Sequence, residues 1–209
     1  MLRILIADDH TVVRKGLRQI LLEEFPSAEI TETADAATLF LKVLREKWDV
    51  VITDISMPDK SGLEVLQQIR RDHPRLPVLI LSAHSEDQYA IRALKAGANG
   101  YLCKDSASEE LVTAIRRILL GKKYITASLA EKLTFQFDQE NDRPPHESLS
   151  DREFEVMKFL ASGKVVSEIA SQLCLSVTTI STYRARILAK MNLKTNYDLT
   201  RYAMENKLL

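Results

Sequence analysis

The sequence predicts two domains of different class: an α/β domain built on a parallel sheet, followed by a smaller domain made only of helices. In residues 1–121, short apolar runs alternate with segments whose apolar residues recur at helical spacing. From Ser148 onward the apolar spacing is helical throughout. Between these parts, residues 138–147 are polar and contain two prolines, which is typical of an extended linker.

Five apolar runs in the first domain have the composition of buried strands. They are Ile4–Ala7, Glu29–Thr33, Val50–Thr53, Val78–Leu81 and Gly100–Cys103. Each is followed by a helical pattern, carried in turn by Val13–Leu21, Ala37–Leu44, Leu63–Ile69, Ala90–Ala96 and Leu111–Leu119. Strands that are apolar on both faces and joined by helices form a parallel sheet covered on two sides, so we predict a (βα)5 domain.

The rest of the chain is divided by the same signals. We place the first domain at residues 1–121, a linker at 122–147 with a short helix over Ala127–Phe137, and the helical domain at 148–209. Four helices are predicted in the last part, near Asp151–Ser162, Val166–Leu173, Val177–Met191 and Asn196–Lys207. Ser150 and Glu153 have the spacing of a capping box at the start of the first of these helices.

The charge of the chain is unevenly distributed, although the formal net charge is zero. From Ser148 to Leu209, nine lysines and arginines stand against six aspartates and glutamates, a net charge of +3, which leaves −3 for the rest. An acidic front and a basic tail suggest two separate tasks, one of them binding nucleic acid, but scatter in surface charge gives so small an excess too.

The compartment is expected to be the cytoplasm. The first residues turn acidic too early for a signal peptide, and no apolar run approaches the roughly 20 residues that span a membrane, so no membrane partner is expected. The two cysteines, Cys103 and Cys174, lie in separate apolar segments without a CxxC partner. We therefore expect buried free thiols in a reducing compartment.

Polar residues follow several of the predicted strands, where the carboxyl ends of a parallel sheet meet at one edge. They are Asp8, Asp9, Asp54, Ser82 and Lys104. Three carboxylates there would repel one another unless a cation neutralised them, and oxygen ligands suit Mg²⁺. A carboxylate can also accept a phosphoryl group, whose charge a lysine would stabilise. Each residue alone is more often a turn, helix-cap or surface residue, but their joint placement favours a phosphoacceptor site.

The first 121 residues resemble the receiver domain of response regulators. The resemblance is carried by Ile6–His10, Val51–Pro58 with Gly62, Leu81–Ala83 and Ala96–Asp105. It implies a flavodoxin-like sheet with strand order 2-1-3-4-5. It also implies a sensor histidine kinase as the partner that supplies the phosphoryl group.

The same resemblance implies a role for each site residue. Asp54 would be the phosphoacceptor, and Mg²⁺ would be held by Asp9, Asp54 and the backbone carbonyl of Ser56, with Asp8 acting through water. Lys104 would pair with the phosphoryl group and Ser82 would move towards it. Tyr101 would be a switch aromatic, although a plain half-buried strand tyrosine is the alternative. Asp105 stands where many receivers have a proline, which bears on the local peptide geometry.

In the second domain, a short helix, a tight turn and a longer helix form a helix-turn-helix pattern. On the longer helix Ile180, Ile187, Leu188 and Met191 share one face, and Thr178, Ser181, Thr182 and Ala185 share another. Hydroxyls and small residues near arginines suit the major groove of DNA. A helical bundle that binds another protein would show the same pattern.

This segment resembles the LuxR-type effector domain, through Leu149–Val156, Ala161–Gly163, Glu168–Ala170, Leu175–Ile180 and the final Leu193–Leu209. A receiver followed by this domain identifies the chain as a member of the NarL/FixJ class of response regulators. The implied partners are double-stranded promoter DNA, a second copy of the chain on phosphorylation, and RNA polymerase as a further candidate. The predicted DNA-binding residues are Thr178, Thr179, Ser181, Thr182, Arg184, Ala185, Arg186 and Lys190.

Members of the class often have other residues at three positions of the reading helix. Tyr183 stands where many have a histidine, and Ser181 and Ala185 where a lysine or asparagine often contacts bases. On the closing helix, Leu199, Tyr202 and Ala203 are candidates for contact between two effector domains.

Two other functions fit part of the pattern. A phosphatase-like hydrolase would need a second aspartate two residues after its nucleophile, where this chain has Ser56. A regulator of the same fold could be switched by something other than phosphate, but its acidic site would not need to be complete. We therefore expect no enzyme beyond the protein's own phosphorylation and dephosphorylation.

Overall fold

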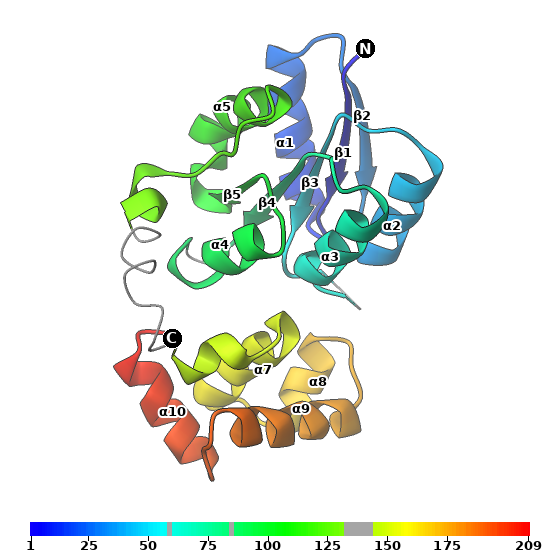
Figure 1. The fold of residues 1–209 in the computed structure, drawn as a ribbon. Helices are drawn as coiled ribbons and strands as arrows, with labels where there is room; N and C mark the ends of the chain where they lie inside the picture. The colour runs from blue at the N-terminus through cyan, green and yellow to red at the C-terminus, as the bar shows by residue number, and fades with distance from the viewer. Residues whose placement is uncertain (58–59, 84–85, 132–143) are drawn as a thin grey trace. The chain divides into compact units, whose positions relative to one another are not determined.

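The structure is a computed structural model that describes residues 1–57, 60–83, 86–131 and 144–209 (Figure 1). The chain divides into two compact units, Met1–Phe135 and Gln136–Leu209. The first unit is α/β and the second is helical, as the sequence predicts.

Parallel strands form the sheet of the first unit, in the order β2-β1-β3-β4-β5. They are β1 (Arg3–Ala7), β2 (Glu29–Thr33), β3 (Val50–Asp54), β4 (Val78–Ser82) and β5 (Gly100–Cys103). Every residue of β3 and β4 is buried, which explains why these strands are continuous apolar runs. The strand order reverses between β1 and β3, and ligands of such sheets bind beside the carboxyl ends of the strands at that point.

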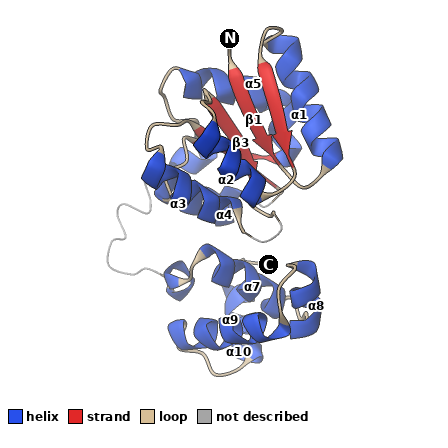
Figure 2. Ribbon diagram, turned by 90° about the vertical axis from the view of Figure 1, so that its right-hand side faces the viewer, coloured by secondary structure: helices blue, strands red, loops and turns tan. Residues whose placement is uncertain are grey.

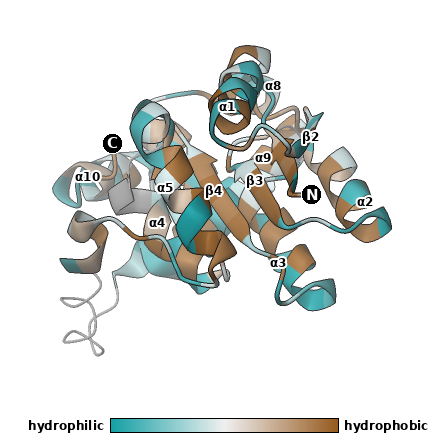
Figure 3. Ribbon diagram, turned by 90° about the horizontal axis from the view of Figure 1, so that it is seen from above, coloured by the Kyte–Doolittle hydropathy of each residue, from teal (hydrophilic) through white to brown (hydrophobic). Residues whose placement is uncertain are grey.

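Helices cover both faces of this sheet, with α1 and α5 on one side and α2, α3 and α4 on the other (Figure 2). They are α1 (Thr11–Glu24), α2 (Ala36–Arg45), α3 (Gly62–Asp72), α4 (Glu86–Lys95) and α5 (Ala107–Leu119), the last preceded by the 3-10 turn η1 (Lys104–Ser106). Leu17 and Leu21 of α1 and Ile115 of α5 share one apolar core with Ile4 and Ile6. The hydropathy colouring shows strands β3 and β4 as hydrophobic and the helices as two-faced (Figure 3).

The chain remains attached to the first unit beyond α5. The backbone N–H of Tyr124 donates to the carbonyl of Asn99, and Tyr124 forms a parallel bridge with Gly100 beside β5. The Tyr124 hydroxyl lies 2.5 Å from a carboxylate oxygen of Glu110. Residues 127–131 are helical, and Leu129 is completely buried. The remainder of the helix predicted over Ala127–Phe137 lies outside the described residues.

The second unit is built from short helices around an apolar centre. They are the 3-10 turn η2 (Pro145–Ser148), α7 (Asp151–Ala161), α8 (Val166–Gln172), α9 (Val177–Lys190) and α10 (Asn196–Glu205). The capping box of Ser150 and Glu153 is confirmed, because each side chain bonds the other residue's backbone N–H. In the part of the chain that the structure describes, no helix combines the length and apolarity needed to cross a membrane.

The two cysteines differ from the sequence expectation. Both are free, but Cys174 is exposed and Cys103 is only partly buried, so the prediction of buried thiols is wrong. Cys174 follows α8 with a φ of 53°, in the turn that reverses the chain towards α9. This turn lies at the surface, which an apolar sequence neighbourhood does not reveal.

Candidate functional site

An acidic pocket lies at the carboxyl ends of β1 and β3. Ala7 pairs with Thr53 in the register of these strands, so Asp8 and Asp54 come next to each other at the sheet edge. Asp8 is buried, and the exposed fraction of Asp54 is 3%. One ligand atom from each of Asp8, Asp9, His10 and Asp54 lies within 4.8 Å of the others. The carboxylates predicted from the sequence therefore meet in one place.

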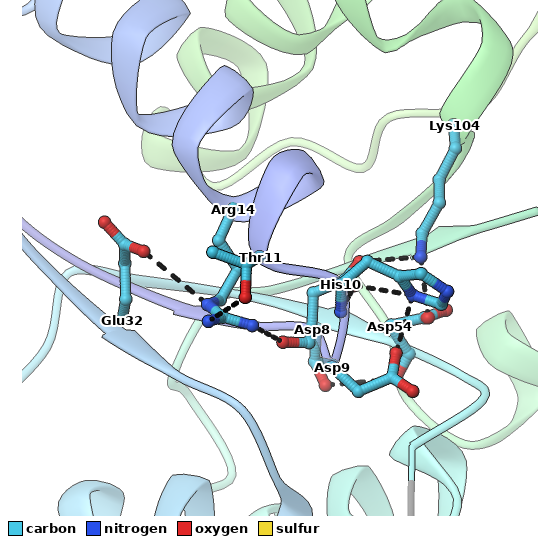
Figure 4. Close-up of polar contacts among 9 residues, drawn as sticks. Asp8, Asp9, His10, Thr11, Arg14, Glu32, Asp54 and Lys104 are labelled. Carbon is cyan, nitrogen blue, oxygen red and sulfur yellow. Dashed lines mark hydrogen bonds and ion pairs between the residues drawn. The ribbon is translucent and has the colours of Figure 1, made fainter.

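Lys104 neutralises part of this negative charge. Its Nζ lies 2.6 Å from Asp8 Oδ2 and 2.7 Å from Asp54 Oδ2 (Figure 4). Burial alone would lower the pKa of Lys104, but its bonds to Asp54 and Asp8 outweigh burial and raise that pKa. The lysine is thus held as a cation between two strand ends. In that position it could stabilise the negative charge of a group transferred to Asp54.

The carboxyl group of Asp54 is buried and has a raised pKa. Burial raises its pKa above the ordinary value, against the hydrogen bond from Lys104, and the nearby charge of Asp8 adds to the rise. A backbone hydrogen bond from Ser56 opposes the rise. Asp54 Oδ1 is buried and has no hydrogen-bond partner among the described residues. A carboxylate oxygen in that state fits a divalent cation or a phosphoryl group.

Gly62 allows helix α3 to approach the backbone at the end of β3. Its backbone N–H donates to the carbonyl of Ile55 at 2.8 Å. A Cβ atom built on Gly62 would lie 1.9 Å from the backbone oxygen of Asp54, closer than any real contact. Any side chain here would therefore displace α3 or the end of β3.

The loop that carries Asp8 and Asp9 is held by Arg14, which the sequence did not single out, and by the backbone of His10 (Figure 4). Arg14 Nη1 donates to the backbone carbonyl of Asp8 at 2.6 Å, while its Nε lies 3.6 Å from a carboxylate oxygen of Glu32 on β2. The backbone N–H of His10 donates to Asp8 Oδ1 at 2.8 Å. Helical spacing marks Arg14 only as polar, so its backbone contact could not be predicted.

The proposed switch residues are both in the core. Ser82 ends β4 and is completely buried, and it pairs with Cys103 in the register that places Lys104 next. Tyr101 lies two residues earlier on β5 and is also completely buried. Tyr101 is therefore a fully buried strand tyrosine rather than a half-buried one, and its switch role stays a prediction.

Helices α8 and α9 form the helix-turn-helix pair predicted from the sequence. On α9 the residues of one face are exposed, namely Thr178, Ser181, Thr182, Ala185 and Arg186. The hydroxyls of Ser181 and Thr182 donate to carbonyls one turn earlier, at 2.9 and 3.0 Å. Opposite them, Ile180 and Ile187 are completely buried. This division leaves a polar surface on the longer helix of the pair.

Three of the predicted DNA-binding residues are engaged within the domain. Arg184 is half-buried, and its Nε donates to Asn196 Oδ1 at 2.7 Å. Lys190 Nζ lies 2.6 Å from a carboxylate oxygen of Glu153, which links the end of α9 to the start of α7. Thr179 is half-buried, and its backbone N–H is capped by Ser176. These contacts hold Arg184 and Lys190 against the neighbouring helices α10 and α7.

A buried ion pair connects α7 to the helix-turn-helix. Arg152 Nη1 bonds Glu155 at 2.6 Å, and Arg152 Nη2 donates to the carbonyl of Leu173, just after α8. Both side chains are largely removed from water. In the sequence Arg152 is only one residue of the motif Leu149–Val156, and this contact could not be predicted because the carbonyl that Arg152 binds lies 21 residues away.

The closing helix α10 is arranged differently from the expectation. Leu199 and Ala203 are completely buried within their own unit, so they are not available to a second copy. The Tyr202 hydroxyl is 2.8 Å from His146 Nδ1 in the η2 segment. The prediction that these residues form a contact surface is wrong for Leu199 and Ala203, because their apolar stripe packs inward.

Family comparisons match both parts of the chain. Residues 4–116 match the response regulator receiver domain, and residues 147–203 match the bacterial regulatory proteins of the luxR family. The response regulator GacA of Pseudomonas aeruginosa is 34% identical, with 100% of this chain and 98% of that protein covered. The response regulator UvrY of Escherichia coli is 35% identical, with 100% and 96% covered.

The fold also has a solved counterpart. The structure of RcsB from Salmonella enterica serovar Typhimurium, bound to promoter rprA in the presence of phosphomimetic BeF3-, is 28% identical. It matches with a TM-score of 0.64, covering 97% of this chain and 98% of that chain. The similarity therefore extends over both units, each taken by itself.

Proposed function

Because this chain belongs to the NarL/FixJ class of response regulators, which are phosphorylation-dependent DNA-binding regulators of transcription, we propose that a phosphoryl group on Asp54 controls its binding to promoter DNA. The observation that carries this assignment is the buried Asp54 carboxylate. Its Oδ2 is held by Lys104 at 2.7 Å, whereas its Oδ1 has no hydrogen-bond partner in the described part of the chain.

The proposed reaction transfers a phosphoryl group from a donor to Asp54. A carboxylate oxygen forms a bond to phosphorus while the bond between phosphorus and the donor breaks, and that electron pair leaves with the donor. Lys104, already beside Asp54 Oδ2, neutralises charge on the transferred group. The hydroxyl of Ser82 then bonds a phosphoryl oxygen, and a change at Tyr101 carries the signal to the domain surface.

The acidic pocket fits a divalent cation, since it gathers three carboxylates and Lys104 contacts only those of Asp8 and Asp54. We assign Mg²⁺ to Asp9, Asp54 and the backbone carbonyl of Ser56, with Asp8 acting through water. When bound, Mg²⁺ neutralises carboxylate and phosphoryl oxygens together. Asp9 is the more exposed of the first two aspartates, so it is open to an arriving ion.

We assign the donor role to a sensor histidine kinase and DNA binding to the exposed face of α9. The promoter-bound RcsB structure supports this assignment of DNA and of a phosphate-dependent state. The active form is proposed to be a homodimer in the cytoplasm, where promoter DNA lies, with RNA polymerase as a further partner. Ser56 stands where a hydrolase would need an acid, so the only chemistry proposed is self-phosphorylation and dephosphorylation.

The test is to locate the phosphoryl group. Incubating the full chain with acetyl phosphate and Mg²⁺, then trapping and mapping the acyl phosphate by mass spectrometry, should place the label on Asp54. Asp54→Asn should abolish the label, whereas Asp105→Asn, which removes an exposed carboxylate beside Lys104, should retain it. Comparable labelling of Asp54→Asn would refute the assignment.

A further inference from the structure

A histidine lies among the carboxylates of the proposed cation pocket. His10 directly follows Asp8 and Asp9, and its Nδ1 lies 2.7 Å from Asp9 Oδ1 and 3.2 Å from Asp8 Oδ1. A ring nitrogen of His10 belongs to the set of ligand atoms that lie within 4.8 Å of one another. Mg²⁺ is bound through oxygen, so the function proposed above gives this imidazole no role.

The fold does not require a histidine at this position. His10 is the N-cap residue of α1, but its side chain makes no capping hydrogen bond. Its backbone N–H donates to Asp8 Oδ1, which any residue except proline could do, and its ring Nδ1 lies 3.2 Å from the same oxygen at the surface of the loop. The side chain is 64% exposed, so it adds little to the core and is open to ions from solvent. A ligand role would explain the imidazole where packing does not.

The pocket also contains an oxygen without a protein partner. Asp54 Oδ1 is buried and has no hydrogen-bond partner in residues 1–57, 60–83, 86–131 and 144–209. Asp54 belongs to the same cluster as the His10 ring nitrogen through one of its carboxylate oxygens. A cation at this point would therefore meet a nitrogen and several oxygens, rather than oxygens alone.

We propose that His10 makes this pocket a mixed nitrogen and oxygen site, which takes imidazole-binding divalent cations such as Ni²⁺ and Zn²⁺ in competition with Mg²⁺. The inference rests on the pocket being the cation site of the proposed function. Imidazole suits Ni²⁺ and Zn²⁺, whereas carboxylate, carbonyl and water suit Mg²⁺. His10 supplies the nitrogen, and Asp9 and Asp54 supply oxygens.

His10 acts in opposite directions on the two classes of cation. For Ni²⁺ the ring is a ligand, so its loss removes a bond to the ion. For Mg²⁺ the ring is a competitor, because its Nδ1 occupies Asp9 Oδ1 at 2.7 Å and must leave that oxygen. Substitution should therefore separate the two affinities. A residue that merely supported the acidic loop would, on substitution, lower both.

The experiment is isothermal titration calorimetry on the full chain with Ni²⁺ and, separately, Mg²⁺. Each Ni²⁺ titration is repeated in excess Mg²⁺, which occupies the pocket. The Ni²⁺ binding that this excess removes is the binding in the pocket. His10→Ala and His10→Gln should weaken this Ni²⁺ binding roughly tenfold or more, since even outer partners of metal ligands contribute about 10–100-fold. Their Mg²⁺ affinity should be equal to that of the wild type or higher. His73→Ala, at the end of α3, is the matched control and should bind both ions normally.

Each other result decides against the inference in a distinct way. Unchanged Ni²⁺ binding in both His10 variants would show that the ring is no ligand. Equal losses for Ni²⁺ and Mg²⁺, with circular dichroism confirming an intact fold, would make His10 a support of the loop. If the wild-type protein binds Mg²⁺ but has no competing Ni²⁺ site, the mixed-ligand proposal is refuted and the proposed Mg²⁺ site stands. A wild-type protein that binds neither ion would overturn the proposed cation site as well.

Discussion

Gly62 is a residue at which α3 comes very close to β3, the strand that ends at Asp54. A side chain there would begin 1.9 Å from the backbone oxygen of Asp54, so the close approach depends on the absence of a Cβ atom. Gly16 is the opposite case, since it is exposed in the middle of α1 and a Cβ built on it would meet nothing within 4 Å. Gly62 is needed because there is no space for a side chain, whereas Gly16 only carries the general conformational cost of glycine in a helix.

Gly62→Ala should lower the free energy of unfolding of the first unit by about 1–3 kcal/mol, as other overpacked cores do. It should also slow phosphorylation of Asp54, because the end of β3 must shift. Gly16→Ala should instead raise stability by about 0.5–1 kcal/mol without changing phosphorylation. Urea titration followed by the fluorescence of Trp48, the only tryptophan, reports on this unit. Equal stability of the two variants would contradict the contact.

Residue positions in the pocket were predictable only where the strand pattern determines them. Asp8, Asp54 and Lys104 follow apolar runs, and the ends of parallel strands converge, so their meeting follows from the sequence. Arg14 could not be found in this way, because its bond to the carbonyl of Asp8 depends on how α1 lies over β2. The catalytic and DNA-contacting roles assigned to individual residues remain predictions.

At the scale of elements, α7 is tied to α9 by the pair of Glu153 and Lys190. Burial alone would raise the pKa of Glu153, but the bonds from Lys190 and from Ser150 outweigh it and lower the pKa below the ordinary 4.5. A carboxylate with a lowered pKa in the folded state stabilises that state above its unfolded pKa. This contribution disappears as the pH falls through the folded value.

The second unit should therefore lose stability in acid below about pH 4.5, through protonation of Glu153. Glu153→Gln should be less stable at neutral pH and should change less with acidification. Amide hydrogen-exchange protection of α7 and α9 measures this unit separately from the first. Glu205→Gln, an exposed carboxylate on α10, serves as the control and should follow the wild type. Parallel pH curves for wild type and Glu153→Gln would exclude the ion pair as the cause.

The strands and the helices of the second unit were predicted to within two residues, because buried strands and amphipathic helices have distinct apolar spacing. Helices of the first unit extend beyond their apolar patterns, and α4 and α5 begin four residues before the predicted starts. Predictions from the sequence were wrong where an apolar residue could lie either in the core or on a contact surface. Leu199 and Ala203 were expected to face a partner but pack inward. Tyr124 lay in the predicted linker, and its bridge to Gly100 depends on the free edge of β5.

At the scale of the whole molecule, the net charge of +3 from Ser148 to Leu209 is small for a DNA-binding domain. One reading helix should bind weakly at cellular salt, since phosphate contacts dominate affinity. Two linked copies make the second contact intramolecular and add about 10²–10⁴ in avidity. Dimerisation is therefore the expected consequence of phosphorylation.

Sedimentation should show mainly monomer without phosphate, and dimer with beryllium fluoride and Mg²⁺ as a mimic of the acyl phosphate. Asp54→Asn should stay monomeric under both conditions, whereas Asp105→Asn should behave as the wild type. Affinity for promoter DNA should rise together with the dimer fraction. A protein that gains DNA affinity while remaining monomeric would require a mechanism other than pairing.

The attachment of Tyr124 beside β5 also determines where this chain can be cut and recombined. A chimera joined directly after α5 would remove Tyr124 and the buried Leu129, and would expose the edge of β5. An uncovered edge strand invites pairing between molecules and aggregation. A Cβ atom built on Gly100 would lie 3.0 Å from the Cβ and the backbone oxygen of Tyr124, so the chain can lie this close to β5 because position 100 is glycine. Modular sensors built from this receiver should therefore keep its own sequence at least through Leu129.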